Sequence, residues 1–188
     1  MLDAAGWKLE GAARKKDGKP LEINFVIPTN VATSKQEAEL IQNMLGQIGV
    51  TVKINAVPTA DFFDKYITPG QFDFTVFSWL GTPYPISSSQ SIYAKPKKND
   101  KGELDIQQNN ARIGSDEIDN LFEQATSELD PKKAIDLANK LDAKLWQEVH
   151  SLTTYQRPEQ VACKKNLANF GAFGFASTTY QDIGWVKS

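Results

Sequence analysis

Residues 21–27 read Leu-Glu-Ile-Asn-Phe-Val-Ile, in which apolar and polar side chains alternate over most of the run. This period of two predicts a β-strand with one apolar face. Residues 50–57 read Val-Thr-Val-Lys-Ile-Asn-Ala-Val, and their polar outer face is typical of an edge strand. Residues 72–79 read Phe-Asp-Phe-Thr-Val-Phe-Ser-Trp and are apolar on both faces, as in the central strand of a parallel sheet. These three segments predict the strands of one β-sheet.

Helices are expected between the strands. Residues 34–37 read Ser-Lys-Gln-Glu, which has the form of a capping box, and a helix is expected from there to Gly49. A shorter helix is expected over residues 60–67. The order strand, helix, strand, helix, strand indicates parallel pairing through right-handed crossovers. The sequence therefore predicts an α/β fold with a βαβαβ core, in which helices flank a mostly parallel sheet.

The second half of the chain has a different pattern. Residues 95–114 lack a period and are rich in lysine, so an exposed loop is expected there. Residues 115–128 and the residues that follow Pro131 carry apolar side chains at helical spacing, which predicts two long helices. Residues 152–155 and 160–163 alternate and are expected to form short strands in a C-terminal tail.

Composition excludes several classes of function. The 188-residue chain has 40% hydrophobic and 23% charged residues, as an ordinary globular protein does. Its formal net charge of −2 and pI of about 5.5 argue against nucleic-acid binding through phosphate neutralisation. A single cysteine, Cys163, and a single histidine, His150, exclude a multi-thiolate or two-histidine metal site. No apolar run approaches the roughly 20 residues that span a bilayer. We therefore expect no metal, no cofactor and no nucleic-acid partner.

A candidate ligand-binding site lies where the predicted strands end. Ligands of open α/β sheets bind beyond the carboxyl ends of the strands, where the strand order reverses. If the first strand lies between the second and the third, this point falls between the ends of the first and third strands. The residues there, together with a tyrosine that follows a predicted tail strand, are Asn30, Ser78, Trp79, Leu80, Gly81, Thr82, Tyr84 and Tyr155. An exposed aromatic ring, a glycine and hydroxyl groups suit ligand recognition, whereas the alternative is a tight turn around a core tryptophan.

The catalytic candidates are weaker, and each has a structural alternative. Asp61 and Asp64 lie one helical turn apart, where acidic residues usually favour the helix dipole. Cys163 stands beside two lysines, although a buried structural cysteine is the favoured interpretation. His150 is expected to cap the end of a helix as an imidazolium. The sequence has no phosphate-binding loop and no nucleophile elbow, so we expect that the protein is not an enzyme.

A series of motifs runs in order along the whole chain. They are residues 2–7 (Leu-Asp-Ala-Ala-Gly-Trp), 17–21 (Asp-Gly-Lys-Pro-Leu), 48–50 (Ile-Gly-Val), 72–74 (Phe-Asp-Phe), 78–81 (Ser-Trp-Leu-Gly), 114–119 (Gly-Ser-Asp-Glu-Ile-Asp) and 129–131 (Leu-Asp-Pro). Together they resemble the carboxy-terminal lobe of a family 5 extracellular solute-binding protein. This family comprises the peptide-, dipeptide- and nickel-binding components of ATP-driven importers. Residues 81–89 and the aromatic, glycine-rich run 170–175 are similar to an actinobacterial branch.

The resemblance implies a type II periplasmic-binding-protein-like lobe over residues 1–188, as a fragment of a larger receptor whose two lobes close over the ligand. The receptor would be extracellular or attached to the cell envelope, often by a lipid anchor. It would deliver a peptide or a related small organic ligand to the membrane permease of an ABC importer. No signal peptide is visible in the chain, as expected of an excised piece. The fragment would be monomeric, and the alternative function is a non-transporting scaffold lobe of the same fold.

The resemblance also implies roles for individual residues. Ser78, Trp79 and Leu80 match the binding strand of the family, whose backbone pairs with an extended peptide. Peptide binders of the family typically place an aspartate three positions after the tryptophan, where it holds the amino terminus of the ligand. Thr82 stands at that position here. Because a hydroxyl cannot supply the ion pair, recognition of free-amine peptides is in question.

Overall fold

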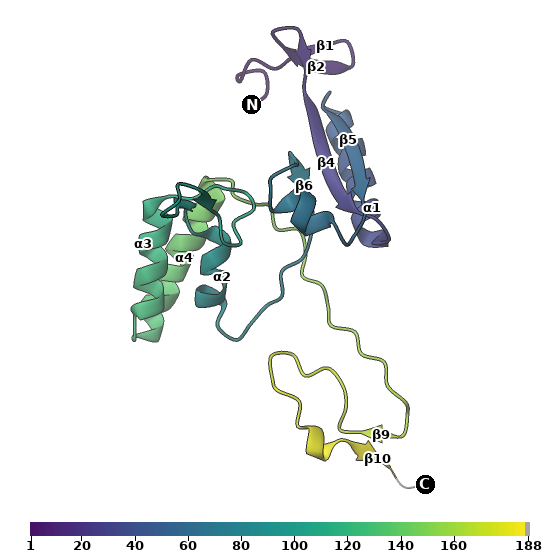
Figure 1. Ribbon diagram of the computed structural model, residues 1–188, viewed down its shortest axis with the longest axis vertical. Helices are drawn as coiled ribbons and strands as arrows, with labels where there is room; N and C mark the ends of the chain where they lie inside the picture. Colours follow the sequence, from purple (N-terminus) through teal and green to yellow (C-terminus); the bar gives the residue numbers. More distant parts are fainter. Residues whose placement is uncertain (187–188) are drawn as a thin grey trace. The chain divides into compact units, whose positions relative to one another are not determined.

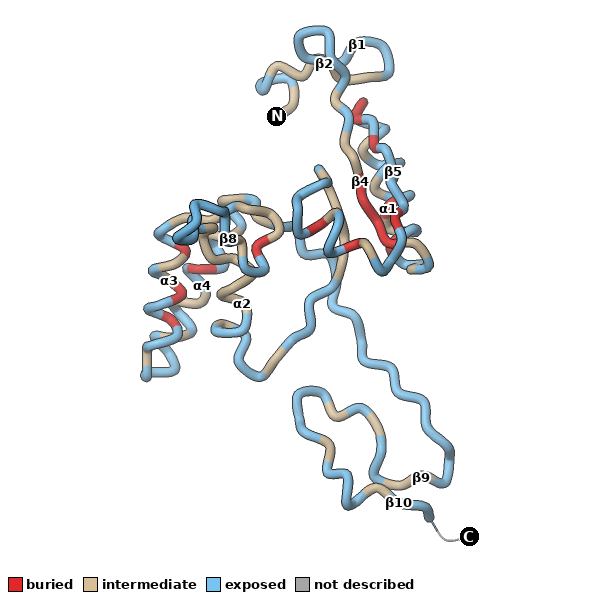
Figure 2. The backbone as a smooth tube through the Cα atoms, viewed as in Figure 1, coloured by how far each residue is buried: buried red, intermediate tan, exposed pale blue. Residues whose placement is uncertain are grey.

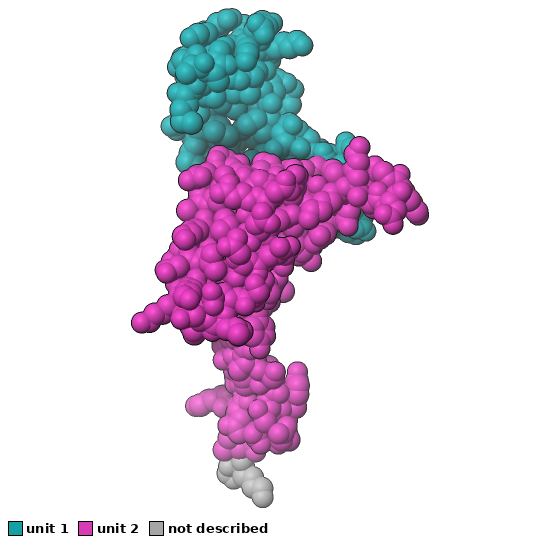
Figure 3. Space-filling view, turned by 90° about the vertical axis from the view of Figure 1, so that its left-hand side faces the viewer, with its two compact units in different colours: residues 1–79 teal, residues 80–188 magenta. Residues whose placement is uncertain are grey.

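The chain forms two compact units, Met1–Trp79 (unit 1) and Leu80–Ser188 (unit 2), in a computed structural model that describes residues 1–186 (Figure 3). Each unit has its own buried residues, which are coloured red in Figure 2. The assignment of residues 1–188 to one lobe of a larger receptor stays a prediction.

Unit 1 is built on a three-stranded parallel sheet. Its strands are β4 (Glu22–Pro28), β5 (Thr51–Val57) and β6 (Phe74–Thr75), in the order β5-β4-β6 (Figure 1). The predicted parallel βαβαβ core is therefore confirmed, as are the edge position of residues 51–57 and the place of the first strand between the other two.

The prediction that residues 72–79 form the central strand was wrong. Strand β6 pairs with β4 only over Phe74 and Thr75, and it lies at an edge of the sheet. The segment is apolar on both faces because its side chains enter two separate cores. Phe74 and Val76 pack against the core on one face of the sheet, whereas Phe72 and Phe77 pack against the other. Because its side chains are buried on both faces of the sheet, the segment has the apolar composition that is typical of a central strand.

Helix α1 (Ala32–Gly46) covers one face of the sheet, and a π-helical segment, η1 (Phe62–Ile67), covers the other (Figure 1). On the α1 side, buried Phe25, Ile27, Ala38 and Val52 form the core. On the η1 side, the core consists of Val26, Val57, Phe62 and Ile67. Burying such side chains contributes about 1.5–3 kcal/mol each, which is the main stabilisation of unit 1.

The predicted capping box at residues 34–37 was wrong. Helix α1 begins earlier than expected, its N-cap residue is Val31, and no side-chain cap is formed. Ser34 lies inside the first turn and is buried against the sheet, with 4% of its surface exposed. A hydroxyl in the first turn therefore mimicked the sequence signature of a cap.

A three-stranded antiparallel meander, which the sequence did not indicate, precedes the sheet. It consists of β1 (Lys8–Glu10), β2 (Ala13–Lys16) and β3 (Lys19–Pro20). Arg14 ties it to the rest of unit 1 by donating to Asp3 Oδ1 at 2.8 Å, Trp7 O at 2.8 Å and Ile48 O at 2.9 Å. The hydrogen bond from Arg14 holds the pKa of Asp3 below its usual range. Gly6 ends the preceding turn with a φ of 90°.

Unit 2 contains the two predicted long helices, α3 (Asp116–Ser127) and α4 (Pro131–Gln147), and a shorter helix, α2 (Pro85–Tyr93). Ser115 caps α3 by accepting from the Ile118 N–H at 3.3 Å. Asp130 caps α4 by accepting from the N–H groups of Lys132 and Lys133. The helices share a core of Ile118, Phe122 and Leu141, with Tyr93 and Ile86 of α2 packed against it.

The predicted exposed loop over residues 95–114 is a loop only in part. Strand β7 (Lys97–Lys98) pairs with β8 (Leu104–Asp105) in a small hairpin. Asn109 is fully buried, and its Nδ2 atom donates to Ala94 O at 2.8 Å and to Ile113 O at 2.7 Å. One polar side chain thus holds both ends of the segment, a role that periodicity does not reveal.

His150 forms an unexpected contact with the buried side chain of Asn109. Its Nε2 atom lies 2.9 Å from Asn109 Oδ1, and its ring meets Tyr93 edge-on at 4.7 Å. Because Asn109 Oδ1 can only accept, His150 Nε2 carries the proton in this contact. Burial lowers the pKa of His150 below its usual range. The expectation that His150 caps a helix as an imidazolium was therefore wrong.

Unit 2 is expected to lose stability as the pH falls below about 6.5, the usual histidine pKa. Because its folded-state pKa is lowered, His150 takes up a proton more readily in the unfolded chain than in the folded one. The stability that neutral His150 contributes is present above that pH and is lost below it. Urea midpoints at pH 7.5 and pH 5.0 measure the effect, with His150→Gln as the control. An equal pH dependence in the variant would contradict this role of His150.

The tail of unit 2 has one small antiparallel sheet, formed by β9 (Leu167–Ala168) and β10 (Gly184–Trp185), and a short 3-10 helix, η2 (Tyr180–Asp182). The strands predicted at residues 152–155 and 160–163 are absent, and this segment is exposed throughout (Figure 2). The segment has no partner strand among the described residues, so no neighbouring strand is present to bury its alternating apolar side chains. Cys163 is exposed as well, so the expectation of a buried cysteine was wrong.

Candidate ligand-binding site

The predicted site residues are divided between the two units. Asn30, Ser78 and Trp79 belong to unit 1, and the others belong to unit 2. In unit 1, β4 and β6 are parallel neighbours, so their carboxyl ends lie at the same edge of the sheet. Asn30 follows β4 and adopts a left-handed φ of 63°, which turns the chain from the strand into α1. Asn30 and Ser78 are both exposed at this edge.

Trp79 is held by an aromatic cluster on the η1 side of the sheet. Its ring meets Phe77 at 5.4 Å, and Phe77 meets Phe63 at 5.2 Å, both edge-on. Phe62, which is buried, completes the cluster at 4.9 Å from Phe63. Trp79 nevertheless keeps 47% of its surface exposed, so it is a supported surface ring rather than a core tryptophan. A large ring fixed on one side and open on the other is suited to stacking on a ligand.

Residues 80–84 lie at the start of unit 2 and lead into helix α2. Leu80 and Tyr84 are 94% and 74% exposed. Gly81 meets the ring of Phe175, which would lie 3.0 Å from a Cβ atom added there, so a larger residue would require that ring to shift slightly. Tyr155 is exposed in the tail, with the guanidinium carbon of Arg157 at 5.9 Å from its ring centroid.

Thr82 is the most constrained of the candidate residues. Its Oγ1 atom accepts from the Tyr84 N–H at 3.1 Å and donates to Ser88 Oγ at 2.9 Å. These bonds connect Thr82 to the residues that lead into α2, whose N-cap residue, Tyr84, forms no side-chain cap. The segment 81–89, which is similar to an actinobacterial branch, is helical from Pro85 onward.

Sequence reasoning missed the residues that support the site. Phe63 and Phe77 hold the Trp79 ring, Phe175 covers Gly81, and Ser88 pairs with Thr82. The aromatic run 170–175 was visible in the sequence, but nothing in it indicated a contact with Gly81. Such contacts come from the tertiary fold and have no local pattern.

The other candidate chemistries gain no support. Asp61 pairs with Lys65 at 3.0 Å within η1, as an ordinary i,i+4 ion pair does. Among residues 1–186, no group of three or more histidine, cysteine, aspartate or glutamate side chains is placed to hold a metal ion. Within the same residues, no helix is both long and apolar enough to cross a membrane.

Comparison with known proteins identifies relatives over the whole chain. Residues 1–101 match the family described as bacterial extracellular solute-binding proteins, family 5 Middle. The oligopeptide-binding protein OppA of Mycobacterium tuberculosis, and likewise that of Mycobacterium bovis, is 40% identical over 186 residues, or 99% of this chain. The chain spans about 30% of the length of these curated relatives.

Solved structures show the same fold. An oligopeptide-binding protein from Thermus thermophilus, complexed with a pentapeptide, aligns with a TM-score of 0.79 at 22% identity over 98% of this chain and 34% of its own. AppA of Bacillus subtilis, in complex with a nonapeptide, aligns with a TM-score of 0.75 at 18% identity over 99% of this chain and 36% of its own. These structures confirm the predicted periplasmic-binding-protein-like fold. The chain belongs to the bacterial extracellular solute-binding proteins of family 5.

Proposed function

We propose that the chain is a ligand-binding part of a larger extracellular receptor (hereafter the receptor), which delivers peptides to the permease of an ABC importer. Support for a peptide ligand comes from the 40% identity to the mycobacterial oligopeptide-binding proteins. The peptide-complexed structures with the same fold add to it. The receptor would reside at the cell envelope, held by a lipid anchor, and would bind its ligand without chemical conversion.

The observation that carries the proposal is the exposed segment that begins at Trp79. The Trp79 ring is fixed by Phe77 and Phe63 and remains half-exposed. Residues 78–81, which include Trp79, are exposed and belong to no strand or helix. An extended peptide can pair with such a backbone by strand addition, while a flat ring contacts one of its side chains.

Trp79→Ala is expected to weaken peptide binding by about 1–3 kcal/mol, or about 5- to 150-fold, because the variant loses a large preorganised contact surface. Equilibrium dialysis of the receptor against a pool of random pentapeptides, counted by mass spectrometry, measures this loss. Trp146→Ala is the matched control, since Trp146 is 49% exposed, like Trp79, but lies on α4.

A folded Trp79→Ala variant that retains all of its peptide would contradict the assignment of Trp79 to the site. Equal losses in the Trp79 and Trp146 variants would contradict it too, because the effect would then not be specific. Retention of no peptide by the unmodified receptor would contradict the proposed function itself.

A further inference from the structure

Two half-exposed rings of unit 1 belong to one continuous aromatic cluster. Phe63 is 46% exposed, much like Trp79. The ring of Phe77 lies between them, with its centroid 5.2 Å from that of Phe63 and 5.4 Å from that of Trp79. Phe62 belongs to the buried core, and its ring centroid lies 4.9 Å from that of Phe63 and 6.5 Å from that of Phe77. The cluster is therefore anchored in the core and exposed at both ends.

The topology of unit 1 brings both exposed rings to the same edge of the sheet. Strand β5 ends at Val57 and is followed by η1, whose first turn contains Phe63. Strand β6 ends at Thr75, and Trp79 follows it. Because β5 and β6 both run parallel to β4, their carboxyl ends lie at the same edge. Ligands of open α/β sheets bind at this edge, so Phe63 is placed to contact the same ligand as Trp79.

The geometry of the cluster suits one further aromatic ring. Neighbouring rings meet edge-on, at an interplanar angle of 77° between Phe63 and Phe77 and of 69° between Phe77 and Trp79. Aromatic rings favour this arrangement, which stabilises a pair beyond the area that it buries. Both end rings keep nearly half of their surface exposed, so each can continue the pattern with a ring of the ligand. Because the core already fixes them, they lose little freedom when the ligand binds.

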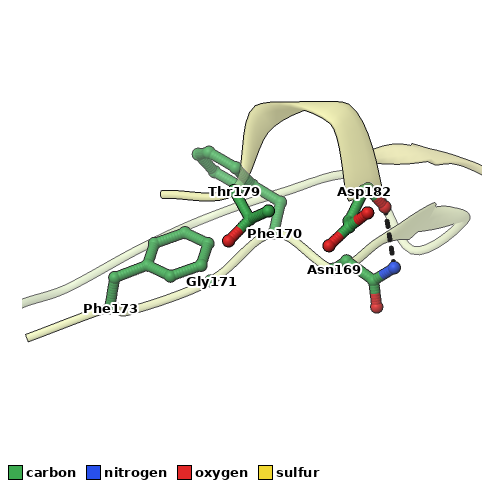
Figure 4. A pocket seen from close by; sticks show the side chains of 6 residues that line it. All are labelled: Asn169, Phe170, Gly171, Phe173, Thr179 and Asp182. Atoms are coloured by element: carbon green, nitrogen blue, oxygen red, sulfur yellow. Dashed lines mark hydrogen bonds between the residues drawn. The ribbon is translucent and has the colours of Figure 1, made fainter. Parts of the chain in front are cut away.

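A second aromatic pair lies in the tail of unit 2. The rings of Phe170 and Phe173 meet edge-on at 6.1 Å and line a pocket of about 620 Å³ (Figure 4). No residue from 164 to 186 is buried, so this pair has no core beneath it. The surface that is preorganised for an aromatic ligand is therefore the one in unit 1.

We propose that Phe63 and Trp79 form a subsite that selects peptides with an aromatic side chain. This inference rests on the proposed function, because it assigns a side-chain preference to the same class of ligand. One aromatic side chain of the peptide lies against the two exposed rings, and Phe77 holds both rings from beneath. Phe63 is thus a residue that determines specificity, in addition to Trp79.

Equilibrium dialysis of the receptor with three kinds of pentapeptide tests the proposal. The reference is pentaalanine, and in the other two kinds one alanine, at each position in turn, is replaced by phenylalanine or by lysine. The best phenylalanine peptide is expected to bind at least about 10-fold more tightly than pentaalanine, because it adds apolar area and edge-on ring contacts. A lysine peptide that binds as tightly would overturn the proposal, since it would indicate a cation on a ring face.

Phe63→Ala is expected to reduce the preference for the phenylalanine peptide by about 3- to 10-fold and to leave the affinity for pentaalanine unchanged. Phe63→Leu, which keeps the apolar bulk without the ring, should also reduce the preference. Phe63→Tyr keeps the ring and should retain it. Phe170→Ala is the matched control, because Phe170 is 40% exposed but lies in the tail pocket (Figure 4).

The outcomes separate the subsite from the proposed function. Equal binding of all the peptides would overturn the subsite and leave the proposed function in place. The same holds for a preference that survives in the Phe63→Ala and Phe63→Leu variants, and for one that Phe170→Ala removes. Binding of no peptide by the receptor would contradict both the subsite and the proposed function.

Discussion

Replacing Phe122 by alanine is expected to lower the free energy of unfolding of unit 2 by about 3–5 kcal/mol. Phe122 is fully buried between α3 and α4, where it packs with Ile118 and Leu141. Its ring also stacks on Tyr93 at 6.5 Å, so one side chain joins α2 to the helix pair. Removing it leaves a cavity in the core that these helices share.

Urea unfolding followed by circular dichroism measures this loss. Phe175→Ala is the matched control, because Phe175 is 63% exposed and its removal is expected to cost less than about 1 kcal/mol. A loss below about 1 kcal/mol for Phe122→Ala would show that the three helices do not depend on a common core.

The 188-residue chain alone is expected to fold as a monomer and to bind peptide at least about 100-fold more weakly than the receptor does. If the ligand is held between this chain and a second lobe, the chain alone loses about half of the contacts. It also loses the closure that removes the ligand from water. A loss of about 3 kcal/mol corresponds to this factor.

Calorimetry of the chain and of the receptor with the same peptide tests this expectation. The Trp79→Ala variant of each protein is the control. If the isolated chain and the receptor bind peptide through the same surface, this substitution should weaken peptide binding by both proteins. Equal affinities of the chain and the receptor would contradict a ligand held between two lobes.

The sequence predicted the elements whose pattern and boundaries are local. Residues 51–57 alternate in character and form β5, with a polar face at the sheet edge. Residues 115–128 and those that follow Pro131 carry apolar side chains at helical spacing and form α3 and α4. In these segments, the residues that determine the structure lie within a few positions of each other.

The errors arose where the partner of a residue is distant. Residues 72–79 have the composition of a central strand, but two separate cores bury their side chains. Asn109 and His150 meet across 41 positions, and neither has a local pattern that predicts the contact. Residues 152–155 alternate as a strand does, yet they form none, because no neighbouring strand is present in the described part of the chain.

In the candidate site, too, the features with a local pattern were predicted and the contacts between distant residues were not. The strand-end rule predicted a site around Trp79 and Gly81, because the order of strands and helices implied where the sheet edge lies. The rule could not supply Phe63 and Phe77 beneath Trp79, or Phe175 against Gly81. These contacts require the path of the chain in three dimensions.

Native mass spectrometry of the receptor as purified from cells shows whether this chain belongs to a receptor that binds peptides. A fraction of the receptor molecules is expected to carry an additional mass. That mass should dissociate on gentle activation and yield peptide fragment ions, and Trp79→Ala should reduce the fraction while Trp146→Ala does not. A receptor that carries no such mass even after incubation with the random pentapeptide pool, or one whose bound mass is not a peptide, would contradict the account.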